Sequence, residues 1–413
     1  MSVEPEQTAP ESRRIPTGFL LLCGVGLFAI LSSTMSKSPV LPLFAKYLGV
    51  SDRELGFVAA ASTYTGIILS IPAGVLSDAW GRKRVLLLAG LVFATAPFLY
   101  PFVHSAWQLA MVRVYHGAAT AIFGPVAIAY VADLAPIRRG EWMGLYSSAT
   151  LVGRSVAPFV GGFILARPNA YHEVYLACGA AGVVALGLGL WLPGRQGRPA
   201  GSPLQSKATA LGAWRQAREG LRFALRSRVV MVTSSVEAVQ YLAFGAVETF
   251  LPLYATRHGI PTWQIGAIFT VQIATIALTK PIMGRLSDTV GRQPVIMGGL
   301  LLGAVSTAAF AISPNVILLA AAATLFGLSM SIVTASTSAL VADATKAAHF
   351  GSSLGVLSTI MDIGHSSGPV VAGFLVAGVS YGWMWGIVGA VLVAATVVFA
   401  VLGRGDSRGA PAA

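Results

Sequence analysis

The feature that constrains this chain most is a succession of apolar blocks, each about 20 residues long. A helix of about 20 residues crosses the roughly 30 Å hydrocarbon layer of a bilayer, because it rises about 1.5 Å per residue. Of the 413 residues, 55% are hydrophobic and only 11% are charged, whereas a soluble chain carries about 25% charged residues. So few charges cannot cover a surface in water, and we predict an all-α membrane protein.

We predict twelve transmembrane helices in two bundles of six. Several connections between the blocks are very short, so neighbouring helices must be antiparallel. The expected spans are 17–42, 54–76, 85–103, 106–132, 143–165, 173–193, 229–255, 263–284, 294–312, 315–341, 353–378 and 382–402.

The domain organisation follows from these spans. We expect a tail at 1–16, an N-terminal bundle at 17–193, a linker at 194–228, a C-terminal bundle at 229–402 and a tail at 403–413. The linker changes from Gly, Pro and Ser to an amphipathic pattern, which predicts a helix on the cytoplasmic leaflet, where anionic lipids attract Arg. Its apolar and basic faces consist of Leu211, Trp214, Ala217, Leu221 and Leu225, and of Arg215, Arg218, Arg222 and Arg226. Binding of a partner protein by this helix stays an alternative.

The net charge of +12 is distributed as membrane topology requires, and we expect no binding to nucleic acid. Basic residues gather in alternate loops, which face the cytoplasm under the positive-inside rule. They are Arg82, Lys83, Arg84, Arg138, Arg139, the linker, Arg285, Arg292, Arg404 and Arg408, against Lys46, Arg53, Arg167 and Arg257 on the other side. The first 16 residues are polar and predict no cleavable signal peptide. We therefore expect a multi-pass protein of the cell (inner) membrane with both termini in the cytoplasm.

An internal repeat divides the chain. A shift of 210 residues aligns segment 74–85 with 284–295, and seven of the twelve positions match. Segment 131–133 matches 341–343 at the same offset, and Gly153, Pro158 and Gly162 match Gly364, Pro369 and Gly373 at an offset one residue longer. Matches in one order at nearly one offset indicate two parallel repeats, which are typical of transporters that rock two halves about a central site.

The repeated segment resembles the loop signature of the major facilitator superfamily, Gly-x-Leu-x-Asp-x-x-Gly-Arg-Lys/Arg, with Ala79 where the family has a basic residue. The resemblance covers essentially the whole chain and implies the major facilitator fold. It also implies that Asp78 and Arg82 stabilise the outward-facing state, with Asp133 as a partner. Two glycines permit a tight turn, and a carboxylate and a guanidinium can join helix ends. The latch residues expected in the two halves are Gly74, Asp78, Gly81, Arg82, Lys83 and Asp133, and Gly284, Asp288, Gly291, Arg292 and Asp343.

A second motif lies in the fifth span. The residues Gly153, Ala157, Pro158, Gly161 and Gly162 are similar to the antiporter motif of drug:proton exporters, with Ala157 in place of one Gly. Small residues four apart let helix backbones approach closely, and Pro adds a kink. Helix packing alone also accounts for this pattern, so both interpretations stay open.

Ionisable residues inside spans are costly and are therefore functional candidates. They are Lys37, Arg113, His116, Arg154, Glu237, Glu248, Lys280, Asp362 and His365. Burial disfavours a charged carboxylate, so Glu237, Asp362 and Glu248 are candidates to carry a proton near neutral pH. Arg113 joins them because Arg113-x-x-x-Gly117 resembles the family motif in which Arg is linked to proton transfer. The alternative is that these groups form permanent ion pairs or structural hydrogen bonds.

Other charged residues suggest a gate and a substrate site. Lys37 and Glu248 are one residue from repeat equivalence, and we hypothesise that they pair across the halves and close the extracellular gate. Alternatively, each reaches water separately. Arg154 and His365 are repeat equivalents that can bind an anionic substrate, whereas Lys280 is expected to reach the headgroups. Lys37, Arg154, His365, Tyr241 and Gln272 are the candidates to line the substrate cavity.

The sequence indicates transport rather than catalysis. It contains no phosphate loop, no catalytic elbow and no cluster with metal-ligand spacing, and Cys23 and Cys178 are expected to be buried thiols. We expect no enzyme activity, no metal and no cofactor, with a proton gradient as the energy source. The expected partners are a small-molecule substrate, protons and membrane lipids, and the expected state is a monomer.

The leading hypothesis is a secondary active transporter that works by alternating access and exports a small lipophilic or drug-like compound in exchange for protons. This is the activity of multidrug-resistance antiporters. The first alternative is a proton-coupled carrier of an organic anion, which Arg113, Arg154 and Lys37 would hold. A non-transporting membrane sensor or enzyme is the alternative from another class, and the absence of catalytic motifs and signalling domains disfavours it.

Overall fold

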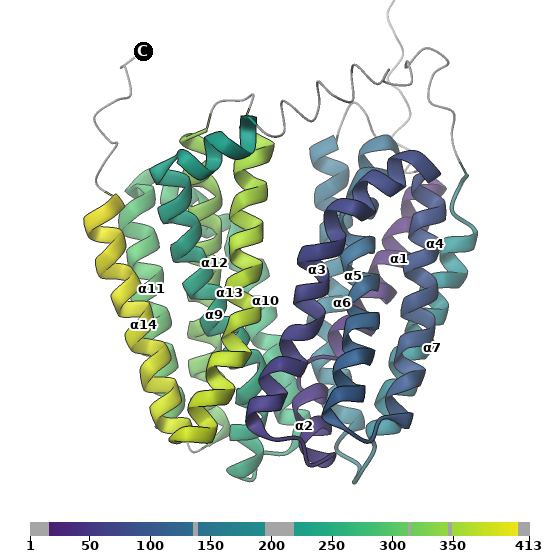
Figure 1. Ribbon diagram of the computed structural model, residues 1–413, viewed down its shortest axis with the longest axis horizontal. Coiled ribbons are helices and arrows are strands. Elements are labelled where there is room, and N and C mark those ends of the chain that lie inside the picture. The colour runs from purple at the N-terminus through teal and green to yellow at the C-terminus, as the bar shows by residue number, and fades with distance from the viewer. Residues whose placement is uncertain (1–15, 135–138, 195–218, 313–314, 346–348, 404–413) are drawn as a thin grey trace, which may run out of the picture.

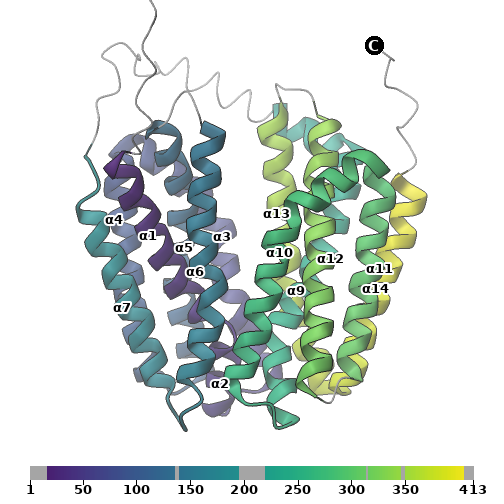
Figure 2. The ribbon, with the colours of Figure 1, turned by 180° about the vertical axis from the view of Figure 1, so that it is seen from behind.

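The computed structural model describes residues 16–134, 139–194, 219–312, 315–345 and 349–403. Within these ranges all regular structure is helical. The helices form two bundles side by side, an N-terminal half and a C-terminal half (Figures 1 and 2). The N-terminal half contains α1 (Thr17–Met35), α2 (Val40–Tyr47), α3 (Asp52–Trp80), α4 (Arg82–Thr95), η1 (Ala96–Phe102), α5 (Ala106–Leu134), α6 (Arg139–Ile164) and α7 (Tyr171–Leu190). The C-terminal half contains α9 (Arg228–Arg257), α10 (Thr262–Val290), α11 (Arg292–Ala311), α12 (Val316–Asp343), α13 (Phe350–Gly378) and α14 (Tyr381–Leu402).

Each predicted span falls on a helix, but length and hydropathy alone do not identify all twelve helices as membrane spans. In the described residues, ten helices are long and apolar enough to cross a membrane, with α1 and α2 taken together and α4 and η1 taken together. An eleventh is α3, which bends by 49° between Asp52–Ser70 and Pro72–Trp80. The remaining span lies in α6, which packs beside α1 and α10. This helix is more polar because part of its surface faces the cavity described below.

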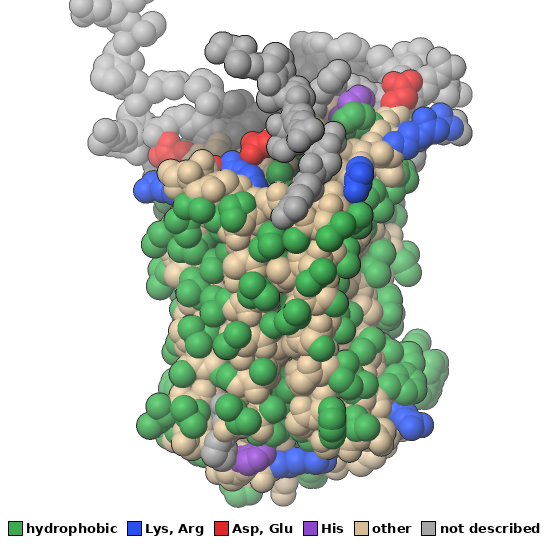
Figure 3. Space-filling model, turned by 90° about the vertical axis from the view of Figure 1, so that its left-hand side faces the viewer, with side chains coloured by type: hydrophobic (Ala, Val, Ile, Leu, Met, Phe, Trp, Pro, Cys, Tyr) green, Lys and Arg blue, Asp and Glu red, His purple; other side chains and the backbone are tan. Residues whose placement is uncertain are grey.

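The outer surface of the molecule matches a bilayer. Figure 3 shows charged side chains at the two ends of the molecule and a band of hydrophobic side chains between them. Large apolar residues such as Val305 on α11 and Val397 on α14 are more than half exposed on this surface. Such a band is stable only against hydrocarbon. The chain is therefore a multi-pass membrane protein.

The first predicted span is interrupted. Helix α1 ends at Met35 and α2 begins at Val40, with Pro39 between them. Proline has no N–H to donate and disfavours a helical conformation in the residue before it. The break places Lys37 in a turn near the centre of the protein.

The two halves touch along two main seams at one end of the molecule, and α2 also contacts α9. In the first seam, α6 meets α10: a Cβ at Gly162 would overlap the carbonyl oxygen of Thr262, and one at Gly266 would overlap that of Pro158. The Thr262 hydroxyl also donates to the Gly162 carbonyl at 2.9 Å. We call the end with these seams the closed end. The small residues around Pro158 therefore let α6 and α10 pack closely across the two halves.

The second seam joins α3 to α13. A Cβ at Gly56 would lie 2.5 Å from the Pro369 carbonyl oxygen, and one at Gly373 would overlap the Asp52 carbonyl. At the opposite end the helices of the two halves diverge (Figures 1 and 2). That end carries Arg82 and Arg292, and we call it the latch end.

Part of the predicted linker helix is described. Residues 219–226 are helical, and the Phe223 ring stacks on His349 at 4.8 Å next to the start of α13. Leu221 and Leu225 are about half exposed, while Ala224 is buried. Predicted features outside the described residues are the tail 1–15, Arg138, Leu211, Trp214, Arg215, Ala217, Arg218 and the tail 404–413.

Candidate functional site

A cavity of about 630 Å³ lies between the two halves. Its walls come from α1, α5 and α6 in the N-terminal half, and from α9, α10, α12 and α13 in the C-terminal half. The seams at the closed end place the solvent access of this cavity at the latch end. The cavity therefore opens to one side of the membrane.

Six ionisable residues line the cavity: Lys37, Arg154, Glu248, Lys280, Asp362 and His365. Tyr241 lines it as predicted, whereas Gln272 does not. Gln272 is fully buried, and its main chain and side chain pack against Gly327 of α12. Lys280, predicted to reach the headgroups, lines the cavity from α10.

Glu248 forms a hydrogen bond with a histidine of its own half, and this contact is an ion pair when the histidine is protonated. Its Oε2 lies 3.1 Å from Nε2 of His365, which connects α9 to α13. The His365 ring also lies 5.5 Å from the ring of Phe244 and 6.0 Å from that of Tyr241, so the pair is part of an aromatic wall. Gly245 lets α13 approach closely, since a Cβ there would overlap the His365 carbonyl.

No direct ion pair joins Lys37 to Glu248, although the two residues act on each other electrostatically across the halves. The two residues line the same small pocket, together with Arg113, but among the described residues the Lys37 ammonium has no ion-pair partner. Sequence equivalence in a repeat gives the helix and the depth of a residue but not the direction of its side chain. His365, on another helix of the same half, is closer to Glu248.

Arg113 is held by a hydroxyl. It is 2% exposed, and its Nη2 donates to the Ser62 Oγ at 2.5 Å. Gly117, one turn further along α5, packs on the Ser62 backbone, where a Cβ would lie 2.7 Å from the Ser62 Cα. The Arg-x-x-x-Gly spacing thus lets α5 approach α3 so that the guanidinium reaches Ser62. His116 lies deeper in this half, with Nδ1 3.3 Å from the Tyr100 hydroxyl.

The predicted carboxylates lie in different surroundings. Glu237 is 3% exposed and accepts a hydrogen bond from the Thr337 hydroxyl at 2.7 Å, between α9 and α12. It does not line the cavity, although Thr334, one turn before Thr337, does. Asp362 faces the cavity from α13, and among the described residues it has no ion-pair partner. Asp362 and Glu248 are therefore in the solute's path, whereas Glu237 is inside the C-terminal half.

The predicted latches are present in both halves with the same partners. Arg82 binds Asp78 at 2.5 Å, Asp133 at 3.2 Å and the Ser77 hydroxyl at 2.5 Å. Lys83 next to it donates to the Leu190 carbonyl at 2.8 Å. In this way one guanidinium joins the ends of α3, α4 and α5.

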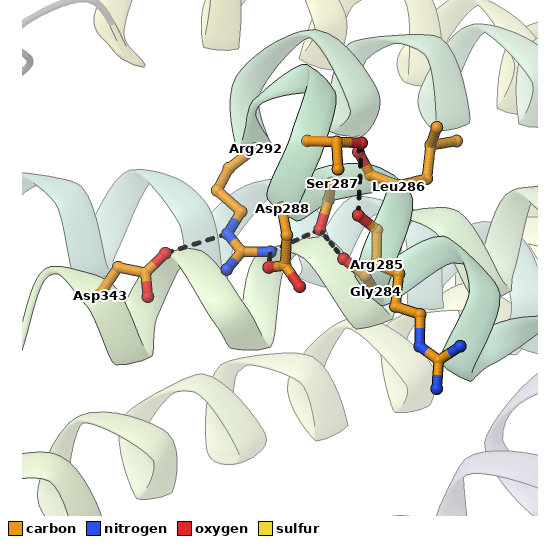
Figure 4. Close-up of polar contacts among 8 residues, drawn as sticks. Gly284, Arg285, Leu286, Ser287, Asp288, Arg292 and Asp343 are labelled. Atoms are coloured by element: carbon orange, nitrogen blue, oxygen red, sulfur yellow. Dashed lines mark hydrogen bonds and ion pairs between the residues drawn. The ribbon is translucent and has the colours of Figure 1, made fainter.

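Arg292 repeats the arrangement in the C-terminal half (Figure 4). It pairs with Asp288, donates to Asp343 at 2.9 Å and donates to the Ser287 hydroxyl at 2.6 Å. Ser77 and Ser287 were not among the predicted latch residues, although a serine stands at this position in both aligned segments. In this state each latch lies within one half and does not join the two halves.

The glycines of the latch motif have different roles. Gly81 has φ of 93° and Gly291 has φ of 103°, a region that favours glycine. These residues form the tight turns before α4 and α11. Gly74 and Gly284 lie inside α3 and α10 with open space where a Cβ would be, so they do not take part in the turn.

The described residues contain no group of three or more His, Cys, Asp or Glu side chains placed to hold a metal ion. Cys23 and Cys178 are free thiols. Two repeats around a cavity, sealed at one end and open at the other, are typical of transporters that rock two halves about a central site.

Comparison with known proteins identifies the family. The Major Facilitator Superfamily model matches residues 21–271 and 263–412, and the chain belongs to this family. Its members are transporters of small molecules and not enzymes. The chain is 25% identical to an uncharacterized MFS-type transporter of Methanocaldococcus jannaschii, over 87% of this chain and 89% of that protein. It is 26% identical to the multidrug resistance protein MdtG of Proteus mirabilis, over 84% and 85% of the two chains.

Solved structures share the fold. A bacterial homolog of the human lysosomal transporter Spinster, in an inward-facing and occupied conformation, matches with a TM-score of 0.74 and 16% identity over 93% of this chain and 94% of its own. The nucleoside transporter NupG matches with a TM-score of 0.72 and 15% identity over 94% and 100%. At these identities the likeness concerns the fold and not the substrate.

Proposed function

We propose that this protein is a proton-coupled exporter of small, drug-like compounds. The observation that carries the proposal is the Glu248–His365 pair in the wall of the central cavity. Among the described residues, His365 is hydrogen-bonded to the Glu248 carboxylate, so a proton on this carboxylate changes the contact that holds His365. The His365 ring packs on Phe244 and Tyr241. Protonation and solute binding therefore act on one surface.

The cavity walls suit a lipophilic compound. Phe244, Ile276, Met330 and Met361 contribute apolar surface, and unbranched methionines adapt to ligands of different shape. The relatives include MdtG, named for multidrug resistance. They also include the quinolone resistance protein NorA of Staphylococcus aureus, which is 29% identical over 40% of this chain and 40% of its own. These names support the drug-like substrate class.

The distribution of basic residues supports an orientation. The latch end carries Arg82, Lys83, Arg84, Arg285 and Arg292, and the positive-inside rule assigns such an end to the cytoplasm. In this orientation the cavity is open to the cytoplasm, both termini are cytoplasmic, and the seams close the outer side of the cell membrane. The compound would enter the cavity from the cytoplasm and leave after the halves rock, while a proton travels inward.

Reconstitution into liposomes with an imposed pH gradient tests the proposal. A panel of lipophilic cations, neutral compounds and organic anions is supplied, and both proton flux and compound movement are measured. We expect at least one compound to move against its gradient and to dissipate the pH gradient. The proposal fails if no compound changes the proton flux and none accumulates. Size-exclusion chromatography with light scattering of the same sample tests the expected monomer.

A further inference from the structure

Two basic residues line the cavity from opposite halves. Arg154 is on α6 and Lys280 is on α10, and both line the cavity. These two helices form the seam at Gly162 and Gly266. At about 1.5 Å per residue, Arg154 lies about 12 Å and Lys280 about 21 Å from the seam, both toward the latch end. They therefore lie on the parts of α6 and α10 that must move when the latch end closes.

Neither residue has a direct polar partner in the part of the chain that the structure describes. Among the described residues, Arg154 and Lys280 form no ion pair and no hydrogen bond. Two charged groups act electrostatically on Lys280: first the Glu237 carboxylate, which belongs to the same half, and then Arg154 from the opposite half. Only the interaction with Arg154 changes when the halves move. Of the two carboxylates in the cavity, Glu248 is bound to His365, and Asp362 lies on α13. The walls formed by α6 and α10 are thus basic.

This arrangement affects the movement of the halves. Closing the latch end brings α6 and α10 together and removes water from between them. Repulsion between like charges grows as the distance and the local dielectric constant fall. An empty cavity therefore resists closing. An anion between the two residues replaces the repulsion with two charge-assisted contacts.

We propose that the exported compound carries an anionic group, bound between Arg154 and Lys280, and that this group permits the latch end to close. The inference rests on the proposed export function and specifies its substrate class. The guanidinium of Arg154 suits a carboxylate, whose two oxygens match its fork. Phe244, Ile276 and Met361 offer apolar surface to the remainder of the molecule. The substrate class is amphipathic organic acids.

The first experiment needs no substrate. Spin labels are attached to cysteines introduced at Gly144 on α6 and Thr289 on α10, two positions near the latch end, in the full-length chain with Cys23 and Cys178 changed to serine. Their distance distribution is measured in lipid nanodiscs. We expect Lys280→Glu to raise the ratio of closed to open carrier by about tenfold, because its new carboxylate attracts Arg154.

Matched variants complete this experiment. Lys280→Gln is expected to shift the distribution in the same direction by a smaller amount, and Lys280→Arg is expected to leave it open. The inference is overturned if the charge-reversed and the neutral variants, each monodisperse and folded, give the open distribution of the parent chain.

The second experiment tests the substrate class in liposomes. Aryl carboxylates are compared with their uncharged primary amides. We expect export of carboxylates, loss of transport for the amides, and an increase of about tenfold or more in the half-saturating concentration with Arg154→Gln. Export of amides or lipophilic cations in place of carboxylates overturns the inference while the proposed exporter stands. Closure in the charge variants without any proton-coupled transport overturns the export function and leaves the closing mechanism in place.

Discussion

In the N-terminal half, Arg82 binds Ser77, Asp78 and Asp133, and in the C-terminal half Arg292 binds the three equivalent residues. The centre of the membrane shows no such agreement between the halves. The carboxylates placed there are Glu237, Glu248 and Asp362, all in the C-terminal half, while the N-terminal half contributes Lys37, Arg113 and Arg154. The C-terminal half also places two basic residues in the cavity, Lys280 and His365.

This contrast separates two tasks. The latches stiffen the helix ends of bodies that move as units, and both bodies need the same stiffening. The cavity walls bind a solute and a proton, and unlike walls can bind unlike species. The two repeats therefore keep the same residues where the halves have the same mechanical role. They differ in sequence where the halves have different chemical roles.

The largest effect is expected in the cavity wall of the C-terminal half, which carries Glu248 and Asp362 and which we call the acidic wall. Glu248→Gln removes the charged partner of His365, and proton-driven transport should fall by about 100-fold or more, since a group that exchanges the proton is lost. Exchange of labelled for unlabelled compound without a pH gradient should persist. Lys37→Met on the opposite wall, where no ion pair is broken, should have the smaller effect. Equal loss in the two variants would contradict the division into acidic and basic walls.

The latches should respond alike. Arg82→Ala and Arg292→Ala each remove one guanidinium with three partners, and we expect each to slow transport by about tenfold because the helix ends lose charge-assisted contacts. Initial rates in liposomes, normalised to the amount of folded protein, measure this. Arg82→Lys and Arg292→Lys serve as controls that keep the charge but not the fork. A large difference between the two alanine variants would show that the halves are mechanically unequal.

The turn glycines offer a comparison of stability. Gly81→Ala and Gly291→Ala place a side chain in a backbone region that suits glycine, and each should destabilise the protein by about 1–3 kcal/mol. Gly74→Ala and Gly284→Ala are the matched controls, because these residues lie inside helices with open space around them. The controls should be neutral or stabilising, by up to about 1 kcal/mol. Thermal unfolding in detergent distinguishes the two pairs.

The smallest effect is expected inside the C-terminal half. Thr337→Val removes the hydroxyl that donates to Glu237 at 2.7 Å and should cost about 1 kcal/mol or slightly more, as for other buried hydrogen bonds. Thr337→Ser keeps the donor and should behave as the parent chain in thermal unfolding. If both variants unfold alike, the hydroxyl does not stabilise Glu237.

Much of the fold was predictable because the information is local. Apolar blocks of the right length set the helices, and the repeated Asp, Gly and Arg located both latches. Composition failed at α6, since a helix that faces a cavity carries the polar residues Ser147, Ser148 and Arg154 and is less apolar than a span surrounded by lipid. The repeat also included Ser77 and Ser287, whose identity in both segments was a usable signal.

The site was predicted less completely, for a geometric reason. A one-residue uncertainty in a helix boundary rotates a side chain by about 100°, and the direction of a side chain decides its partner. This uncertainty affected Gln272, which is buried against α12, and Lys280, which faces the cavity. The pairing of Glu248 with His365 depends on how α9 and α13 pack, which no local pattern specifies.

The seam between α6 and α10 has a consequence of its own. Its contacts are the backbones of Pro158, Gly162 and Gly266, and one hydroxyl of Thr262. None of these groups gains or loses a proton at physiological pH. A transporter driven by a pH gradient needs a closed end whose packing does not depend on pH. The barrier then stays closed while groups in the central cavity bind and release protons. This uncharged seam can provide packing of that kind.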